Sequence, residues 1–189
     1  MSEPVLPLGG ASFDGLVRVS EFGPLGQVTL RGDLESKTLK TAVKQATGHD
    51  VPDQRGVTGT GESGVLWMSP DELLILTSYA QAPALAADLQ ARLAGTHAMV
   101  VNMSDARAVF RIECAQVRDV LAKIAPVDLA FDRFAPGELR RTRLAQAAAG
   151  FWLVDNECAQ IFCFRSVAEY MFDLLSTVSA ADSAVGYYG

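Results

Sequence analysis

The sequence contains few of the residues from which catalytic and metal-binding centres are built. Its 189 residues include two histidines, His49 and His97, and three cysteines, Cys114, Cys158 and Cys163. A catalytic nucleophile needs a neighbouring base, usually histidine, and both histidines follow glycine-containing turns where we expect exposed side chains. The cysteines show none of the short spacings typical of zinc ligands. We therefore predict no catalytic residue and no metal site in this chain.

Positive charge and long apolar runs are also scarce. The 16 lysines and arginines are outnumbered by 22 acidic residues, which gives a formal net charge of -6. Because phosphate binding needs a basic surface, we do not expect nucleic acid as a partner. The N-terminus lacks the basic start and apolar run of a signal peptide, and no stretch reaches the roughly 18 apolar residues that span a bilayer. These features, with free cysteines, predict a cytoplasmic protein without membrane contact.

Proline and glycine recur in residues 1–25, with little hydrophobic periodicity. We predict here an extended N-terminal arm that needs another surface to order it. The remaining chain has the composition of a folded protein, with 49% hydrophobic and 20% charged residues overall. We expect a single domain over residues 26–178, made of two halves at about 26–103 and 104–178, and a frayed tail over 179–189.

The first half contains two segments with helical periodicity. One opens at Asp33 or Ser36 and is closed by Gly48, and the other covers residues 81–94. Residues 69–72, Ser-Pro-Asp-Glu, separate two apolar runs and predict a tight turn. The strands expected in this half are 27–31, 65–68, 73–77 and 99–103.

The second half repeats this order of elements. Ala108, Phe110 and Ile112 alternate with charged residues, which is typical of a strand with one buried face. The last helix opens with a capping box formed by Ser166 and Glu169. Other expected elements are a helix from Val117 to Pro126 and strands at 142–147, 151–154 and 160–164. The repeated order predicts an α+β fold of two related half-domains, each with a mainly antiparallel sheet and helices on one face.

One segment matches a cofactor motif by its letters alone. Gly59-Thr-Gly61-Glu-Ser-Gly64 spells GxGxxG, the fingerprint of dinucleotide-binding sites. That fingerprint works where a strand leads through the glycines into a helix whose N-terminus holds the pyrophosphate. Here a loop precedes the glycines and a strand follows them. We therefore interpret the segment as a flexible loop and predict no cofactor in this chain.

Five residues are candidates for a partner interface. Arg140, Arg141 and Arg143 form the one basic cluster, and on a strand Arg141 and Arg143 share a face while Arg140 takes the other. A solvated sheet edge and a docking site for an acidic partner both remain open for this cluster. Trp67 and Trp152 are either core residues or interface anchors.

An ordered series of segments runs through about residues 64–176. Its segments are Leu66–Leu74 (LWMSPDELL), Val100–Arg107 (VVNMSDAR), Val120–Lys123, Val127–Leu129, Phe134–Gly137, Thr142–Ala145 and Phe164–Tyr170. In order and spacing this series resembles the gamma subunit family of heterotetrameric sarcosine oxidase, and it departs from the family pattern at Asn102 and at the turn 114–116.

The resemblance implies a fold similar to that of the folate-binding aminomethyltransferases and a chain without catalytic residues. The complex would oxidise sarcosine to glycine and pass the one-carbon unit to tetrahydrofolate. FAD, FMN, NAD and the folate site would belong to the larger subunits. The alpha subunit is the expected partner, together with the beta and delta subunits, and this chain would stabilise the large flavoprotein subunit. Two alternatives stay open: a stand-alone folate-binding protein of the aminomethyltransferase or tRNA-modifying type, and a homo-oligomeric adaptor.

Overall fold

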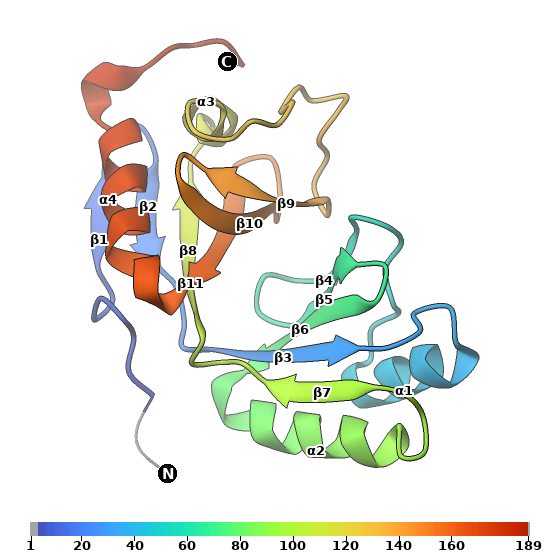
Figure 1. Ribbon diagram of the computed structural model, residues 1–189. Coiled ribbons are helices and arrows are strands. Elements are labelled where there is room, and N and C mark those ends of the chain that lie inside the picture. The colour runs from blue at the N-terminus through green and yellow to red at the C-terminus, as the bar shows by residue number, and fades with distance from the viewer. Residues whose placement is uncertain (1–3, 189) are drawn as a thin grey trace. The chain divides into compact units, whose positions relative to one another are not determined.

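The computed structural model describes residues 4–188, and the chain divides into two units (Figure 1). The middle unit runs from Pro24 to Ser104, and the terminal unit combines the described residues up to Gly23 with those from Asp105 onward. Each unit has its own antiparallel sheet and its own hydrophobic core. The boundary after Ser104 lies one residue from the boundary between halves that we expected.

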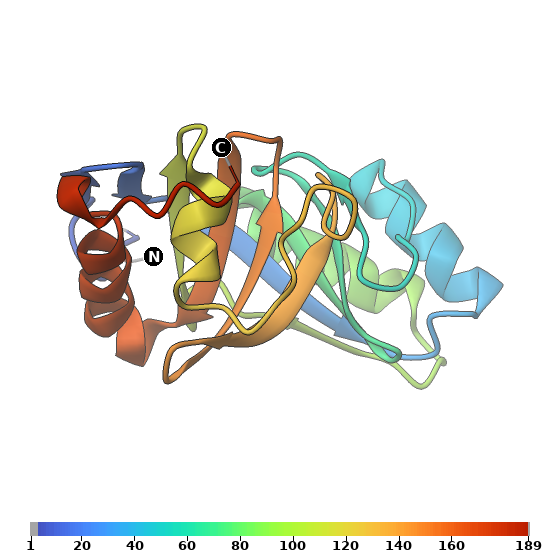
Figure 2. The same cartoon turned by 90° about the horizontal axis from the view of Figure 1, so that it is seen from above.

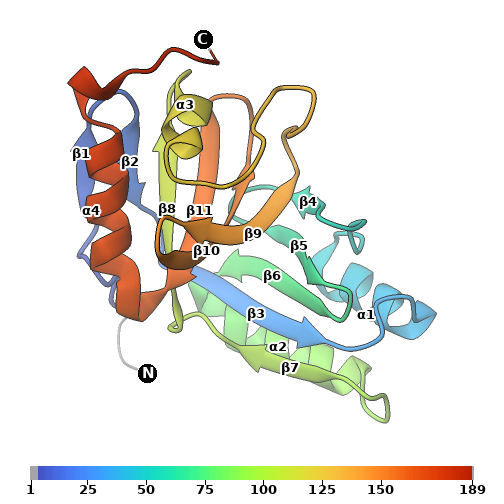
Figure 3. The ribbon, with the colours of Figure 1, turned by 45° about the horizontal axis from the view of Figure 1, so that its top comes forward.

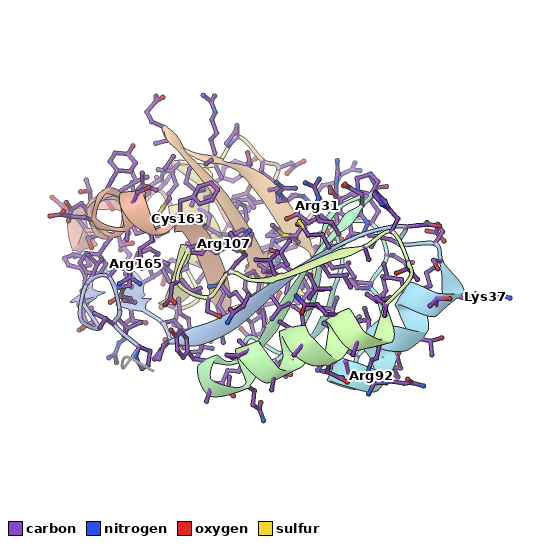
Figure 4. The ribbon with its side chains drawn as sticks, turned by 60° about the horizontal axis from the view of Figure 1, so that its bottom comes forward. Arg31, Lys37, Arg92, Arg107, Cys163 and Arg165 are labelled. Atoms are coloured by element: carbon purple, nitrogen blue, oxygen red, sulfur yellow. The ribbon has the colours of Figure 1, made fainter. Side chains whose placement is uncertain are left out.

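The middle unit is a five-stranded sheet covered by two helices. All its strand pairs are antiparallel, in the order β4-β5-β6-β3-β7. Figure 4 looks onto the face that α1 and α2 cover. The elements are β3 (Leu25–Arg31), α1 (Lys37–Thr47), β4 (Val57–Gly59), β5 (Gly64–Ser69), β6 (Glu72–Ser78), a 3-10 turn η1 (Tyr79–Gln81), α2 (Ala82–Arg92) and β7 (Met99–Asn102).

Local sequence explains the elements of this unit. In α1, Leu39, Ala42 and Val43 recur at helical spacing and are buried in the core. Gly48 ends the helix in a left-handed conformation with φ 78°, and its N–H donates to the carbonyl oxygen of Lys44. Ser69 pairs with Glu72 across the turn between β5 and β6. The predicted helix end and the predicted tight turn are both confirmed.

The terminal unit is a six-stranded sheet with two helices. Its strands are again antiparallel, in the order β1-β2-β8-β11-β10-β9. The elements are β1 (Ser12–Asp14), β2 (Arg18–Glu21), β8 (Arg107–Glu113), α3 (Val117–Ala122), β9 (Leu139–Leu144), β10 (Ala147–Leu153), β11 (Cys158–Phe164), the 3-10 turn η2 (Arg165–Val167), α4 (Ala168–Val178) and the 3-10 turn η3 (Ala181–Ser183).

One face of this sheet carries the core of the terminal unit. Phe110 of β8 pairs with Ile161 of β11, which pairs with Phe151 of β10, and all three side chains are fully buried. Helices α3 and α4 add Val120 and Met171 to the same cluster. The prediction that β8 has one buried face is therefore confirmed, because Ala108, Phe110 and Ile112 all belong to this core.

The two units share one order of elements. In the middle unit β3 leads through α1 to the meander β4–β5–β6 and then to α2, and in the terminal unit β8 leads through α3 to β9–β10–β11 and then to α4. The sheet orders correspond, and a 3-10 turn precedes both α2 and α4. β7 lies beside β3, whereas the equivalent place beside β8 is filled by β2. The structure confirms an α+β fold of two related halves.

The described part of the N-terminal segment is not an extended arm, and that expectation was wrong. β2 pairs with β8 from Arg18↔Glu113 to Glu21↔Phe110, and β1 pairs with β2. The carboxylate of Glu21 also accepts hydrogen bonds from the backbone N–H groups of Leu8 and Gly10. The partner strand β8 lies some 90 residues further along the chain. The local proline and glycine content therefore could not predict this pairing.

Residues 179–188 are held in place where we expected fraying, and Gly189, the last residue of the expected tail, lies outside the described residues. The ammonium of Lys123 donates to the carbonyl oxygens of Val178 and Ser183, and the N–H groups of Tyr187 and Tyr188 donate to Asp119. Figures 1 and 3 show the C-terminal segment passing over α3. The bonds from Lys123 and to Asp119, rather than the composition of the tail, give residues 179–188 their order.

The expected capping box of the last helix is absent. Ser166 lies within η2, α4 begins at Ala168, and its N-cap residue Val167 makes no side-chain capping hydrogen bond. The 3-10 turn occupies the place where the capping box would form, so Ser166 lies too early to cap the first helical turn.

Candidate functional site

The two histidines do not form a catalytic centre with neighbouring groups. His49 is half-buried, with its Nε2 3.3 Å from the Ser63 hydroxyl, in an exposed contact that links the end of α1 to the β4–β5 turn. A working base also needs an orienting group and a site that excludes water. His97 is exposed. Within residues 4–188, no three His, Cys, Asp or Glu side chains are grouped so as to hold a metal ion.

The cysteines are free thiols in three different environments. Cys114 is exposed, Cys158 is half-buried and Cys163 is buried. Burial raises the pKa of Cys158 to about 11 and that of Cys163 to about 12. Since the thiolate is the nucleophile and the metal ligand, both thiols are inert at neutral pH. The sequence favoured buried free thiols; all three thiols are free, but only Cys163 is fully buried and Cys114 is exposed.

The GxGxxG segment does not fit a dinucleotide. Gly59 ends β4 and pairs with Gly64 at the start of β5, so the segment is the connection of a β-hairpin. Within it the N–H of Thr60 donates to the carbonyl oxygen of Ser63 at 2.7 Å. Gly59 has φ 100°, a conformation that favours glycine. No helix begins here, so the N–H groups that would hold a pyrophosphate are missing. The loop that we expected is an ordered hairpin connection.

Two surface hollows lie on the middle unit. One, of about 370 Å³, is lined mainly by polar residues that include Thr47, Thr77 and Asp88. The other, of about 410 Å³, lies between α1 and α2, where Figure 4 labels Lys37 and Arg92. Small-molecule sites are mostly apolar and bury most of their ligand. Both hollows lie open on the surface and would leave much of such a ligand exposed.

The arginine cluster lies on β9, an edge strand of the terminal sheet. Arg140 pairs with Phe151 of the core face, whereas Arg141 pairs with Gly150 and Arg143 with Ala148. Arg141 and Arg143 therefore share one face of the sheet and Arg140 lies on the other, as we expected. Arg141 and Arg143 are exposed.

Arg140 is bound within its own unit. Its Nη2 lies 2.7 Å from a Glu138 carboxylate oxygen, its guanidinium carbon lies 4.8 Å from the centre of the Phe134 ring, and its side chain is 17% exposed. Arg140 thus stabilises the edge of the sheet, and Arg141 and Arg143 are the exposed members of the cluster.

The two tryptophans differ in burial. Trp67 on β5 is half-buried and packs against the core of the middle unit. Trp152 on β10 is 2% exposed, and its ring lies 6.2 Å from that of Phe162. With so little exposed surface, Trp152 can offer almost nothing to a partner. Trp67 remains a candidate for the interface.

Sequence reasoning missed two buried charged residues on α3. Arg118 is 2% exposed and Asp119 is 5% exposed, although both belong to residue types that are rarely buried. In the sequence they are two of many charged residues, and a six-residue helix has no clear periodicity. Figure 2 shows the C-terminal segment crossing α3.

Among the helices of the described chain, none is long and apolar enough to cross a membrane.

Comparison with solved structures defines the class of fold. The aminomethyltransferase of the glycine cleavage system from Bartonella henselae superposes with a TM-score of 0.59 at 13% identity. That match covers 82% of this chain and 44% of the other, so this chain spans less than half of that protein. At this identity the likeness concerns the fold alone. The chain therefore has an α+β fold of the aminomethyltransferase type.

The family follows from the sequence and from a second structure. The family model of the sarcosine oxidase gamma subunit matches residues 31–181. A chain of the heterotetrameric sarcosine oxidase from Corynebacterium sp. U-96, solved in complex with pyrrole 2-carboxylate, is 29% identical with a TM-score of 0.81. That match covers 92% of this chain and 90% of the other. No curated protein sequence matches this chain. The chain belongs to the sarcosine oxidase gamma subunit family.

Proposed function

We propose that this chain is the non-catalytic gamma subunit of a cytoplasmic, heterotetrameric sarcosine oxidase and that it stabilises the large flavoprotein subunit. The observation that carries the proposal is the match to a chain of a heterotetrameric sarcosine oxidase over nine-tenths of both chains. In this proposal the complex converts sarcosine to glycine and transfers the one-carbon unit to tetrahydrofolate. FAD, FMN, NAD and the folate belong to the other subunits.

The arrangement of residues in this chain supports a role without chemistry. The thiols of Cys158 and Cys163 are held protonated, and the GxGxxG segment is a hairpin connection. We expect the alpha subunit to be the direct partner and the beta and delta subunits to complete the assembly. Arg141 and Arg143 are suited to an acidic patch of that partner, because arginine is enriched at interfaces.

The test is co-expression of the other subunits with and without this chain. We expect a complex that co-purifies with this chain, and poor solubility or low oxidase activity of the large subunit without it. Full and stable activity without this chain would contradict the proposal.

The arginine contribution is tested in the same system. Replacing Arg141 and Arg143 by alanine should weaken assembly more at low salt than at high salt, because exposed ion pairs are screened. Lys37→Ala on α1 is the matched control, since it removes an exposed cation from the middle unit.

Two measurements on the purified chain separate the alternatives. A stand-alone folate-binding protein would bind tetrahydrofolate in a calorimetric titration, whereas we expect no heat of binding. A homo-oligomeric adaptor would elute as a multimer that does not dissociate when the other subunits are added. The proposed gamma subunit should leave any such form and enter the complex.

A further inference from the structure

Five of the six residues of helix α3 are buried, and Ala122 at its end is exposed. Val117, Val120 and Leu121 face the core of the terminal unit. The opposite side of the helix carries Arg118 and Asp119, which are also buried. Two charged side chains are therefore covered by the loop that follows α3 and by the C-terminal segment, and their partners decide what this region can bind.

Arg118 uses only one of its nitrogen atoms within the described chain. Its Nη1 donates to the carbonyl oxygens of Leu129, at 2.7 Å, and of Phe134, at 2.8 Å. Its Nε and Nη2 are buried and have no hydrogen-bond partner among residues 4–188. These two N–H groups point from the same edge of the planar guanidinium, which is the edge that binds a carboxylate through two parallel hydrogen bonds.

The charge of Arg118 is also not neutralised by a neighbouring carboxylate. No ion pair of the described residues includes it, and Asp119 instead accepts hydrogen bonds from the N–H groups of Tyr187 and Tyr188, at 3.0 and 3.1 Å. A buried cation without a counter-ion is costly. None of residues 4–188 supplies this counter-ion.

Aromatic side chains cover this arginine and extend to the surface. The guanidinium carbon of Arg118 lies 4.2 Å from the centre of the Phe131 ring, and that ring meets Tyr188 edge-on at 6.4 Å. Tyr188 in turn meets Tyr187 edge-on at 4.8 Å. Phe131 is 59% exposed and Tyr187 is 78% exposed. We call Phe131, Tyr187 and Tyr188, together with the Arg118 side chain that they cover, the α3 surface.

We propose that the α3 surface docks against a larger subunit of the oxidase and that a carboxylate side chain of that subunit binds the Nε–Nη2 edge of Arg118. This proposal rests on the proposed gamma-subunit function. Tyrosine and arginine are the residue types, along with tryptophan, that contribute most binding energy at interfaces, and they do so at sites that exclude water. A carboxylate is the complementary charge, and the aromatic surroundings favour a protein partner over a free anion.

Access to Arg118 requires only a local movement. Phe131 and the segment around Tyr187 are exposed, and the two hydrogen bonds to Asp119 hold that segment on α3. We expect a shift of Phe131 or of this segment to accompany binding of the partner to the unpartnered edge of the guanidinium. The partner then takes over the role of covering it.

The test measures the affinity of the purified chain for a complex of the other subunits prepared without it. Phe131→Ala and Tyr187→Ala should each weaken binding by about tenfold or more, as expected for interface hot spots. Phe164→Ala and Tyr170→Ala are matched controls, because they remove exposed aromatic residues elsewhere on the terminal unit, and they should change the affinity less than about twofold.

The carboxylate contact is tested with Arg118→Lys, which keeps the charge but lacks the paired N–H groups. We expect weakened binding with an unchanged far-ultraviolet circular dichroism spectrum. If this variant does not fold, the Nε–H resonance of Arg118 in the wild-type chain is compared with and without the other subunits. A downfield shift in the complex supports the contact, and an unchanged resonance overturns it.

The outcomes separate this inference from the proposed function. If the wild-type chain does not bind the other subunits, both fail. If the wild-type chain binds and Phe131→Ala and Tyr187→Ala bind equally well, the gamma-subunit function stands and the α3 surface is not its interface.

Discussion

The carboxylate of Glu21 accepts a hydrogen bond of 2.8 Å from the backbone N–H of Gly10. It also accepts one from the N–H of Leu8 at 3.0 Å, and Glu21 itself is only 8% exposed at the end of β2. One buried side chain thus fastens the segment before β1 to the sheet of the terminal unit. The first residues that the structure describes are held by this chain itself.

Replacing Glu21 tests this anchoring. Hydrogen bonds to charged groups contribute about 1.5–3 kcal/mol each. We expect Glu21→Ala to lower the free energy of unfolding by about 2 kcal/mol and to expose residues before β1 to proteases. Chemical denaturation and limited proteolysis of the purified chain measure the two effects. Glu35→Ala is the control, because its ion pair with Lys40 is exposed and should change stability by less than about 0.5 kcal/mol.

Arg140 and Arg143 are expected to respond differently to the same substitution. Arg140→Ala removes the contact with Glu138 and the stacking on Phe134, so we expect a loss of about 1–2 kcal/mol in the free energy of unfolding. Arg143→Ala on the exposed face should change it by less than about 0.5 kcal/mol. Urea denaturation of both variants gives the comparison. Equal losses would contradict the structural role of Arg140.

The start of α4 gives a prediction opposite to that of a capping box. Because Ser166 lies in η2 and makes no cap, Ser166→Ala should leave the free energy of unfolding within about 0.5 kcal/mol of the wild type. Gly48→Ala should lower it by about 1 kcal/mol, because Gly48 has φ 78° and alanine is strained there. Chemical denaturation of both variants gives the comparison. If Ser166→Ala lowers the free energy of unfolding as much as Gly48→Ala does, Ser166 caps the helix after all.

The buried thiols predict a pH dependence of stability. Burial raises the pKa of Cys163 from 9.0 to about 12, so the folded chain keeps this proton at pH values where the unfolded chain loses it. Stability from this thiol is complete below pH 9 and declines as the pH rises towards 12. As the pH rises above 9, Cys163→Ala should therefore lose less stability than the wild type does, as measured by chemical denaturation at a series of pH values.

The reactivity of the thiols at neutral pH checks the burial of Cys158 and Cys163. We expect a disulfide reagent to modify exposed Cys114 quickly and Cys158 and Cys163 only slowly, with all three reacting after unfolding. Fast modification of Cys163 in the folded chain would show that its side chain is not buried as described.

Several elements could be predicted because their signals are local. The apolar spacing of Leu39, Ala42 and Val43 defines α1, and Gly48 defines its end. The repeated order of strand, helix, strands and helix predicted two related halves, which the sheet orders reproduce. The ordered segments from Leu66 to Tyr170 indicated the family, which the match over residues 31–181 confirms.

The candidate interface could be predicted only in part. Strand periodicity placed Arg141 and Arg143 on one face, and the register agrees. For Trp152 the sequence left a core and an interface position open and favoured the core, because tryptophan is highly buried on average; its 2% exposure agrees with the favoured alternative. Assembly with other subunits follows from the family resemblance, and no spacing of residues in this chain encodes it.

The sequence by itself determined the periodic elements, their order and the absence of a histidine pair or cysteine cluster, since all of these depend on residues close together in the chain. Tertiary structure decided where β2 pairs, because its partner β8 lies about 90 residues away. It also decided that Arg118 is buried with one edge unpartnered, because the loop after α3 and the C-terminal segment meet there only when the chain is folded. Long-range contacts of this kind leave no periodic trace in the sequence, and in this chain they form the surface that we expect a partner to recognise.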